Sequence, residues 1–184
     1  RSTRVRSSAA SDVYKRQAIN MEQKYIYSFS QIEDKVKALH ETNTKAAAAV
    51  ALSWLGLSHD ELKTLRVSDY NSTMRMLHSA GRVVYVREDL IADMLKAICE
   101  EAPEYSMGFF ITDVNSAYEA AEKQELSPIS VLKMRYFYEK HSAKLSGEPE
   151  DRVFLKEILR SVGESEADME KQFAEYEKDA PEKI

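Results

Sequence analysis

The feature that most constrains the fold of this chain is a run of small apolar residues at positions 46–55, with the sequence AAAAVALSWL. Alanine is the best helix former, and the run is apolar on nearly every side. Such a segment predicts a helix that is buried all round, with other helices packed against it. Gly56 comes next and is typical of a helix end, because glycine readily adopts the left-handed conformation found there.

A second, short helix is expected directly after this glycine. Ser58 and Glu61 have the spacing of a capping box, in which the side chain of each residue bonds the backbone N–H of the other. Leu62 and Leu65 then lie on one side of the helix and predict its contact with the core. Asp69 marks the exit from this segment.

Helical periodicity and cap signals predict six more helices. They are expected near residues 30–40, 88–102, 115–122, 129–145, 151–162 and 165–179. The expected N-caps are Ser30 (in a capping box with Glu33), Asn43 or Thr44 for the buried helix, Asn115, and Asp151. The chain has only five glycines and four prolines, which favours a mostly helical protein.

The period of the sequence changes between residues 72 and 86. Residues 83–86, VVYV, are strand formers, and Ser79, Ala80 and Gly81 before them form a turn-like set. This stretch predicts a β-hairpin on the helical body. The expected fold class is therefore mainly α with a small β-hairpin or sheet, an α+β fold.

The first residues are set apart from the rest of the chain. Positions 11–17, SDVYKRQ, resemble a translated sequencing-library adapter, so we expect residues 1–20 to be adapter-derived or disordered. The alternative is a natural basic arm for DNA. Met21 is a plausible start, although the gene itself could begin further upstream. We expect residues 21–180 to form a single domain.

The charge balance restricts the partners of that domain. Without residues 1–17 the chain carries 21 basic and 30 acidic residues, a net charge of −9 against −5 for the whole chain. Nonspecific nucleic-acid binding draws on the neutralisation of phosphates, so the global charge argues against it. A role in DNA binding therefore requires a local basic face.

The cysteine, histidine and hydropathy patterns exclude several other classes. The single cysteine, Cys99, provides no disulfide framework or cysteine-based zinc site, and we expect a buried, inert thiol. The four histidines show no metal-ligand spacing, and no glycine-rich phosphate loop is visible. No apolar run reaches the roughly 18 residues of a membrane span. We therefore expect no metal, no cofactor and no membrane contact, and a place in a reducing bacterial cytoplasm.

Residues 56–69 also carry a resemblance to a known family. They are similar to the opening of the catalytic domain of tyrosine recombinases (phage integrases), in which an apolar helix precedes Gly-Leu-Arg, Glu-Leu, Leu and a closing Asp. The matching residues are Gly56, Leu57, Glu61, Leu62, Leu65 and Asp69. The order of the later elements is similar too. The resemblance implies that residues 21–180 form one integrase-like domain of the catalytic type.

In that family two arginines, a lysine and histidine-type donors hold a DNA phosphate that a tyrosine attacks. Arg135 matches the second arginine of the pattern, and Tyr176 is the nearest candidate nucleophile, three residues after the expected position. The residues alone leave alternatives open. Arg135 could be a surface or ion-pairing residue, and Tyr176 could pack with Phe173 and Met169.

The other positions of the family pattern are replaced. Ser58 stands for the first arginine, Leu132 and Glu164 stand for the two histidines, and Phe173 lies at the spacing of the tyrosine. A carboxylate at Glu164 would repel a phosphate. His59, next to Ser58, is expected on a solvated side of its helix. Because the members of one catalytic unit act together, we expect no strand cleavage.

Three sets of basic residues predict a local face for DNA phosphates. One is a stripe with i, i+4, i+8 spacing, one lies on the preceding helix and one lies on the hairpin. They are Arg152, Lys156 and Arg160; Lys133, Arg135, Lys140 and Lys144; and Arg75 and Arg82. The alternative is an ordinary solvated face with acidic neighbours such as Glu139 and Glu157.

The resemblance thus implies a DNA-binding, catalytically inactive recombinase-like protein of a phage or mobile element, with a regulatory or accessory role such as repression. Double-stranded DNA is the expected partner. A homo-oligomer through the C-terminal helix is also expected, because this segment docks on a neighbouring subunit in the family. Two alternatives stay open: a helical protein-interaction module that does not bind DNA, and an active recombinase fragment that uses Tyr176.

Overall fold

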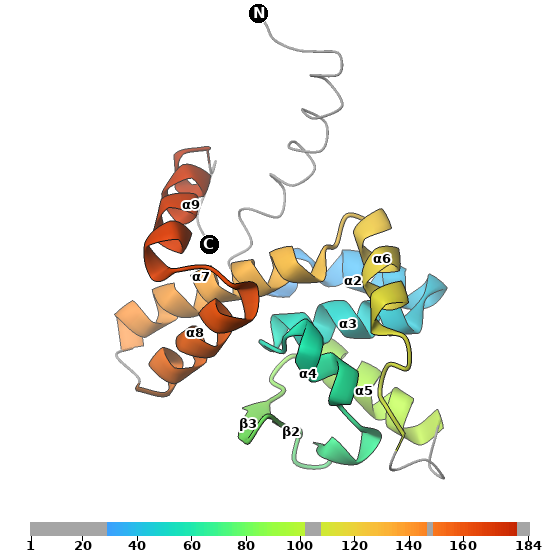
Figure 1. Cartoon of the computed structure of the whole chain (residues 1–184). Coiled ribbons are helices and arrows are strands. Elements are labelled where there is room, and N and C mark those ends of the chain that lie inside the picture. Colours follow the sequence, from blue (N-terminus) through green and yellow to red (C-terminus); the bar gives the residue numbers. More distant parts are fainter. Residues whose placement is uncertain (1–28, 102–107, 147–148, 180–184) are drawn as a thin grey trace, which may run out of the picture.

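The computed structural model describes residues 29–101, 108–146 and 149–179, with side chains except for those of residues 141–146, 149–154 and 176–179 (Figure 1). The helices are α2 (Glu33–Thr42), α3 (Thr44–Trp54), α4 (His59–Thr64), α5 (Asp89–Glu101), α6 (Val114–Lys123), α7 (Pro128–Ser146), α8 (Pro149–Val162) and α9 (Glu166–Asp179). Short 3-10 helices are η1 (Phe29–Gln31) and η2 (Val67–Asp69), and the strands are β1 (Tyr70–Asn71), β2 (Met76–Ser79) and β3 (Arg82–Tyr85). The prediction of a mainly helical protein with a small sheet is confirmed.

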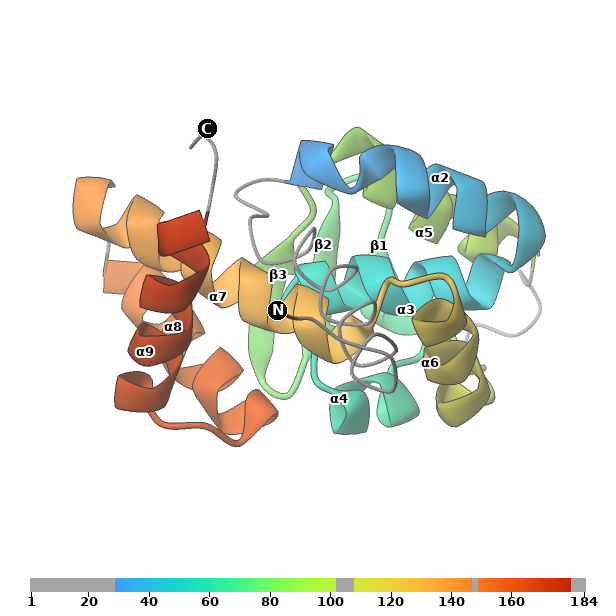
Figure 2. The same cartoon turned by 90° about the horizontal axis from the view of Figure 1, so that it is seen from above.

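The alanine-rich helix α3 is the centre of the structure. Its residues 46–54 are all buried, and α2, α5, α6 and α7 pack around it (Figures 1 and 2). Asn43 caps α3 by accepting a hydrogen bond from the backbone N–H of Ala46 on its Oδ1 at 3.0 Å. Of the two expected caps, Asn43 is the one used, because Thr44 is already the first helical residue.

The end of α3 has the hydrogen-bond pattern expected of a glycine stop. Gly56 has a φ of 94°, and its N–H donates to the carbonyl oxygen of Ser53 at 2.9 Å. The N–H of Leu57 donates to the carbonyl oxygen of Leu52 at 3.1 Å. These two bonds form a Schellman motif, which turns the chain sharply toward α4.

Helix α4 begins with the predicted capping box. The Oγ of Ser58 accepts from the N–H of Glu61 at 3.2 Å, and the carboxylate of Glu61 accepts from the N–H of Ser58 at 3.1 Å. Leu62 and Leu65 are buried in the core, as their spacing predicts. The turn at residues 55–58 is therefore fixed from both sides, by the end of one helix and the start of the next.

The sheet has three antiparallel strands in the order β1-β2-β3. In the β2–β3 hairpin, Ser79 faces Arg82 and the loop consists of Ala80 and Gly81, with φ angles of 50° and 76°. Two central residues with positive φ are typical of a type I′ turn, which matches the twist of paired strands. The predicted hairpin is confirmed, and β1 is an addition to it, too short to leave a periodic signal in the sequence.

Three of the predicted helix starts are wrong by a few residues. Helix α2 begins at Glu33 after η1, and its N-cap position, Ile32, makes no side-chain cap bond, so Ser30 does not cap it. Helix α6 is capped by Asp113, whose Oδ1 accepts from the N–H of Ser116 at 3.0 Å, and not by Asn115. Helix α8 begins at Pro149, two residues before Asp151.

Helices α8 and α9 lie together beside the C-terminal part of α7 (Figure 2). Gly163, with a φ of 71°, ends α8 and leads into α9. Met169 on α9 is fully buried, and the ring of Phe173 lies 5.0 Å from that of Phe137 on α7, measured between centroids. The side chain of Tyr176, expected to pack with Phe173, lies outside the described residues.

Two further points concern membrane contact and the N-terminal segment. None of the helices in the described residues has both the length and the apolar character that crossing a membrane requires. The expectations about residues 1–20 fall on a segment outside the described residues.

Candidate functional site

The turn between α3 and α4 is where two of the sequence-predicted arginines meet. Arg135, from α7, donates from Nη1 to the carbonyl oxygen of Trp54 at 2.7 Å. Arg82, from β3, donates from Nη2 to the carbonyl oxygen of Gly56 at 3.1 Å. The two carbonyls are two residues apart, so a helix and a hairpin far from each other in the sequence are joined through one turn.

Arg135 is enclosed by groups that neutralise and shield its charge. Its Nε donates to Oε1 of Glu139 at 2.8 Å, and its Nη2 lies 2.6 Å from the same oxygen. The guanidinium carbon lies 5.1 Å from the ring centroid of Trp54 and 5.9 Å from that of Tyr138. The side chains of Arg135 and Glu139 are only 12% and 7% exposed. Arg135 is thus an ion-pairing residue that also binds the end of α3.

Arg82 is neutralised in the same way by Glu61. Its Nη2 lies 2.8 Å and 3.0 Å from the two carboxylate oxygens, and the same carboxylate accepts from the Oγ of Ser79 at 2.7 Å. The sequence identified Glu61 as part of a capping box with Ser58 and as a match to the recombinase pattern, but not as a partner of the hairpin. Its partners on the hairpin lie 18 and 21 residues away, and no local pattern in the sequence points to them.

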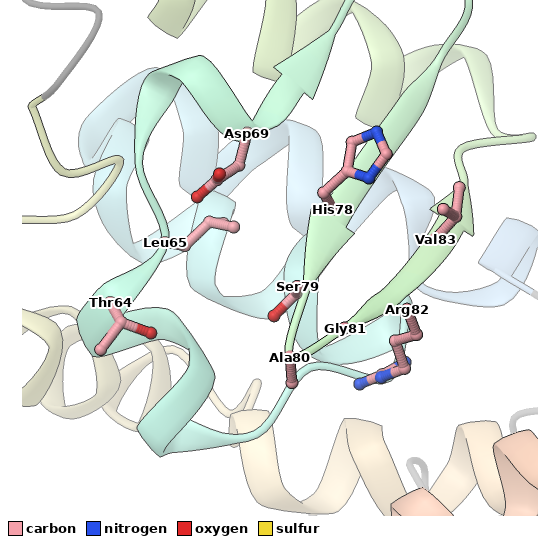
Figure 3. A pocket seen from close by; sticks show the side chains of 9 residues that line it. All are labelled: Thr64, Leu65, Asp69, His78, Ser79, Ala80, Gly81, Arg82 and Val83. Atoms are coloured by element: carbon pink, nitrogen blue, oxygen red, sulfur yellow. The ribbon is translucent and has the colours of Figure 1, made fainter.

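A hollow of about 280 Å³ lies between the end of α4 and the hairpin. Figure 3 shows that its lining comes from two sides, the segment after α4 and the hairpin with its turn. The lining residues are Thr64, Leu65, Asp69, His78, Ser79, Ala80, Gly81, Arg82 and Val83. Arg82 therefore faces both this hollow and the turn at Gly56, while Arg135 takes no part in the lining.

The positions that differ from the recombinase pattern also have clear structural roles. Leu132 is buried in the core. Glu164 forms an ion pair with Lys133 at 2.6 Å and accepts from Nε2 of Gln172 at 2.6 Å. The hydrogen bond from Lys133 holds the pKa of Glu164 below its usual value. Glu164 is consequently a charged partner for a lysine.

The remaining predicted DNA-binding residues are paired with carboxylates wherever a partner is described. The pairs are Arg75 with Asp89 (2.9 Å), Lys140 with Glu166 (3.6 Å) and Glu170, and Arg160 with Glu157. Lys156 is exposed on α8. The side chains of Lys144 and Arg152 lie outside the described residues. The structure thus spreads these basic groups over α7, α8 and the hairpin region, and Arg75, Lys140 and Arg160 lie beside carboxylates.

His59 is half-buried and contacts α6, whereas we expected a solvated position. Its Nε2 lies 2.8 Å from Oδ1 of Asn115, and its ring meets that of Tyr118 edge-on at 4.8 Å. Both partners belong to α6, which packs against α4. This contact between helices far apart in the sequence covers part of the His59 side chain.

The single cysteine, Cys99, is half-buried, whereas we expected a buried thiol. Burial raises the pKa of the Cys99 thiol, which lies 3.9 Å from the carbonyl oxygen of Val67. This environment favours the inert thiol that we expected. Among the residues that the structure describes, no three histidines, cysteines or carboxylates are grouped so as to hold a metal ion.

Comparison of the chain with protein-family models, with curated proteins and with solved structures gives no match.

Proposed function

We propose that this protein binds double-stranded DNA without cutting it, as a regulatory or accessory factor of a bacterial phage or mobile element. The observation that supports the proposal is the meeting of Arg135 and Arg82 at the turn between α3 and α4. In the tyrosine recombinases that residues 56–69 resemble, the same three segments (the turn, the sheet and the later helix) supply the groups that hold a phosphate. The arrangement of these segments is the argument for a shared scaffold.

The proposed loss of cleavage follows from what the two arginines contact. Phosphoryl transfer needs positive donors free to meet the charge that develops on the phosphate. Here Glu139 and Glu61 already neutralise Arg135 and Arg82, and Ser58 occupies the place of the other arginine. Each carboxylate would also repel an incoming phosphate.

DNA contact is then expected at exposed cations outside this turn. Lys156 and Arg160 are one helical turn apart on α8, and the side chain of Arg160 is 74% exposed. Its pair with Glu157 is a surface ion pair, which a phosphate can replace at little cost. Such contacts fix the protein on the duplex and are weakened by salt.

The test is fluorescence anisotropy with a labelled duplex from the neighbourhood of the gene, measured over a salt series. We expect affinity to fall with salt, and Lys156→Ala with Arg160→Ala to reduce the log–log slope by about 2, one for each lost phosphate contact. The matched control is Lys96→Ala with Lys123→Ala, which removes two exposed lysines from α5 and α6. An equal effect of both pairs would contradict a DNA face on α8.

A second candidate function is a helical protein-interaction module. It is favoured by the carboxylate partners of the described basic residues, by the net charge of −5, and by exposed apolar side chains on and beside the hairpin. Those side chains are Met74 (62% exposed), Val83 (42%) and Tyr85 (58%). Absence of DNA binding at about 50 mM salt, where phosphate contacts are strongest, would favour this candidate over the first.

Strand cleavage is tested separately with a duplex that carries a nick opposite the cleavage strand. We expect no covalent protein–DNA adduct on a denaturing gel. An adduct that disappears in Tyr176→Phe would overturn the claim of inactivity and support an active recombinase fragment.

A further inference from the structure

We propose that Glu164 and the helix that follows it, α9, form an internal acidic cover for Lys133 and Lys140 of α7, and that a DNA duplex must displace this cover to reach the two lysines. This inference rests on the proposed DNA-binding function and adds a regulatory element to it. The affinity of the protein for DNA is then set by a competition for the two lysines, between the phosphates of DNA and the carboxylates of the cover.

The ion pairs between the two segments carry the argument. Lys133 on α7 lies 2.6 Å from a carboxylate oxygen of Glu164, and Lys140, two helical turns further along, pairs with Glu166 and Glu170. Residues 164–175 contain five carboxylates and one lysine. Three of these carboxylates, those of Glu164, Glu166 and Glu170, thus meet cations of α7 in the way that the phosphates of a nucleic acid would.

The low exposure of the two lysines supports the same conclusion. The side chains of Lys133 and Lys140 are 25% and 22% exposed, so their ammonium groups are partly covered. Lys140 also lies 5.8 Å from the ring centroid of Tyr136. A phosphate can reach these groups fully only after the carboxylates of α9 have moved away.

The attachment of α9 is consistent with release. The structure describes two apolar side chains that attach it: Met169, which is buried, and Phe173, whose ring lies against that of Phe137 at a tilt of 34°. Gly163, at the start of the connection, has a φ of 71°, and the space beside its Cα is open. The carboxylates of Glu166 and Glu170 are 70% and 41% exposed, and ion pairs at such exposure are individually weak and screened by salt.

The test compares three forms of the full chain. One carries Glu164→Gln, Glu166→Gln and Glu170→Gln, which removes the covering charges but keeps the side-chain shapes. The matched control carries Glu100→Gln, Glu119→Gln and Glu122→Gln, which changes the net charge equally at exposed sites on α5 and α6. Binding to a duplex and to heparin, a polyanion that is not a nucleic acid, is measured for both and for the unchanged protein.

We expect the first variant to bind both polyanions at least about fivefold more tightly than the control at ~0.1 M salt, with a log–log salt slope steeper by about 2. Adding Lys133→Gln and Lys140→Gln should abolish the gain. Should circular dichroism show that the triple variant is unfolded, Glu166→Gln with Glu170→Gln alone, at the more exposed positions, provides the same comparison.

The two proposals fail in different ways. A gain for heparin with no DNA binding by any variant would uphold the cover and overturn the proposed function. Equal binding by the triple variant and the control would overturn the cover, whatever the affinity of the unchanged protein for DNA.

Discussion

The guanidinium of Arg135 donates a hydrogen bond of 2.7 Å to the carbonyl oxygen of Trp54, which lies 81 residues earlier in the chain. Trp54 is the last residue of α3, and the final carbonyls of a helix have no partner within the helix. Arg135 therefore closes the end of the central helix, and the same cation contacts the face of the Trp54 ring. Arg135 can therefore stabilise the fold whether or not the protein binds a phosphate.

Replacement of Arg135 by alanine should lower the free energy of unfolding by about 3 kcal/mol, because it leaves the carboxylate of Glu139 almost buried and without its cation. Urea denaturation at neutral pH provides the measurement. As a control, Arg135→Leu combined with Glu139→Leu removes both charges and should recover at least about 1 kcal/mol of the loss. A decrease in the free energy of unfolding of less than ~1 kcal/mol for Arg135→Ala would contradict the role of Arg135 at the end of α3.

Replacement of Glu61 by alanine should cost about 3 kcal/mol, more than loss of an ordinary helix cap, for which about 1 kcal/mol is typical. The larger value is expected because the same carboxylate also holds Arg82 and Ser79. A double-mutant cycle with Arg82→Gln isolates the ion-pair contribution in denaturant unfolding. Additive effects of the two substitutions would show that the hairpin and the cap are energetically independent.

Replacement of Ala80 by asparagine should stabilise the protein by about 0.5 kcal/mol. Ala80 has a φ of 50° in the hairpin turn, a conformation that asparagine tolerates better than alanine, and Asn-Gly is the preferred pair for a type I′ turn. The change is measured as a rise in the thermal midpoint. Ser79→Asn serves as a position control, since Ser79 lies in β2 and its hydroxyl bonds Glu61, so asparagine there should destabilise.

Stability should fall steeply between pH 10 and pH 12. Burial raises the pKa of both Tyr118 and Tyr136 to about 12 in the folded state, whereas an unfolded tyrosine titrates near 10. Below pH 10 both states keep these protons, so the stability is fully present. Above it the unfolded state releases protons first, and stability is lost until the folded pKa near 12 is passed.

Denaturant midpoints at pH 9, 10 and 11 measure this loss. Tyr118→Phe combined with Tyr136→Phe should flatten the decline, and Tyr85→Phe, at an exposed position on β3, should leave it unchanged. A decline as steep in the double variant as in the unchanged protein would assign the alkaline transition to other groups.

The elements that depend on local chemistry could be predicted from the sequence. The capping box at Ser58, the stop at Gly56 and the turn at Ala80 and Gly81 are each decided by residues within a few positions of one another, and all are present. Where several good caps stand close together, local chemistry does not select among them. This is why Asp113 was missed in favour of Asn115, two residues away.

The partners of the candidate site could not be predicted in the same way. Glu139 lies four residues after Arg135, so their pair has a helical spacing that the sequence contains. The bonds from Arg135 to Trp54 and from Arg82 to Glu61 join segments brought together only by packing. The same holds for the contact of His59 with α6, which leaves this side chain half-buried.

The alanines of α3 set how closely the surrounding helices can approach. A methyl group is the smallest side chain that still defines a packed surface, so at positions 46–49 and 51 the backbones of neighbouring helices lie near the backbone of α3. An added methylene at such a position would press on the helices packed around α3, among which α7 carries Arg135. The small side chains of α3 thus set the spacing of the helices around it, and larger residues at these positions are expected to destabilise the protein.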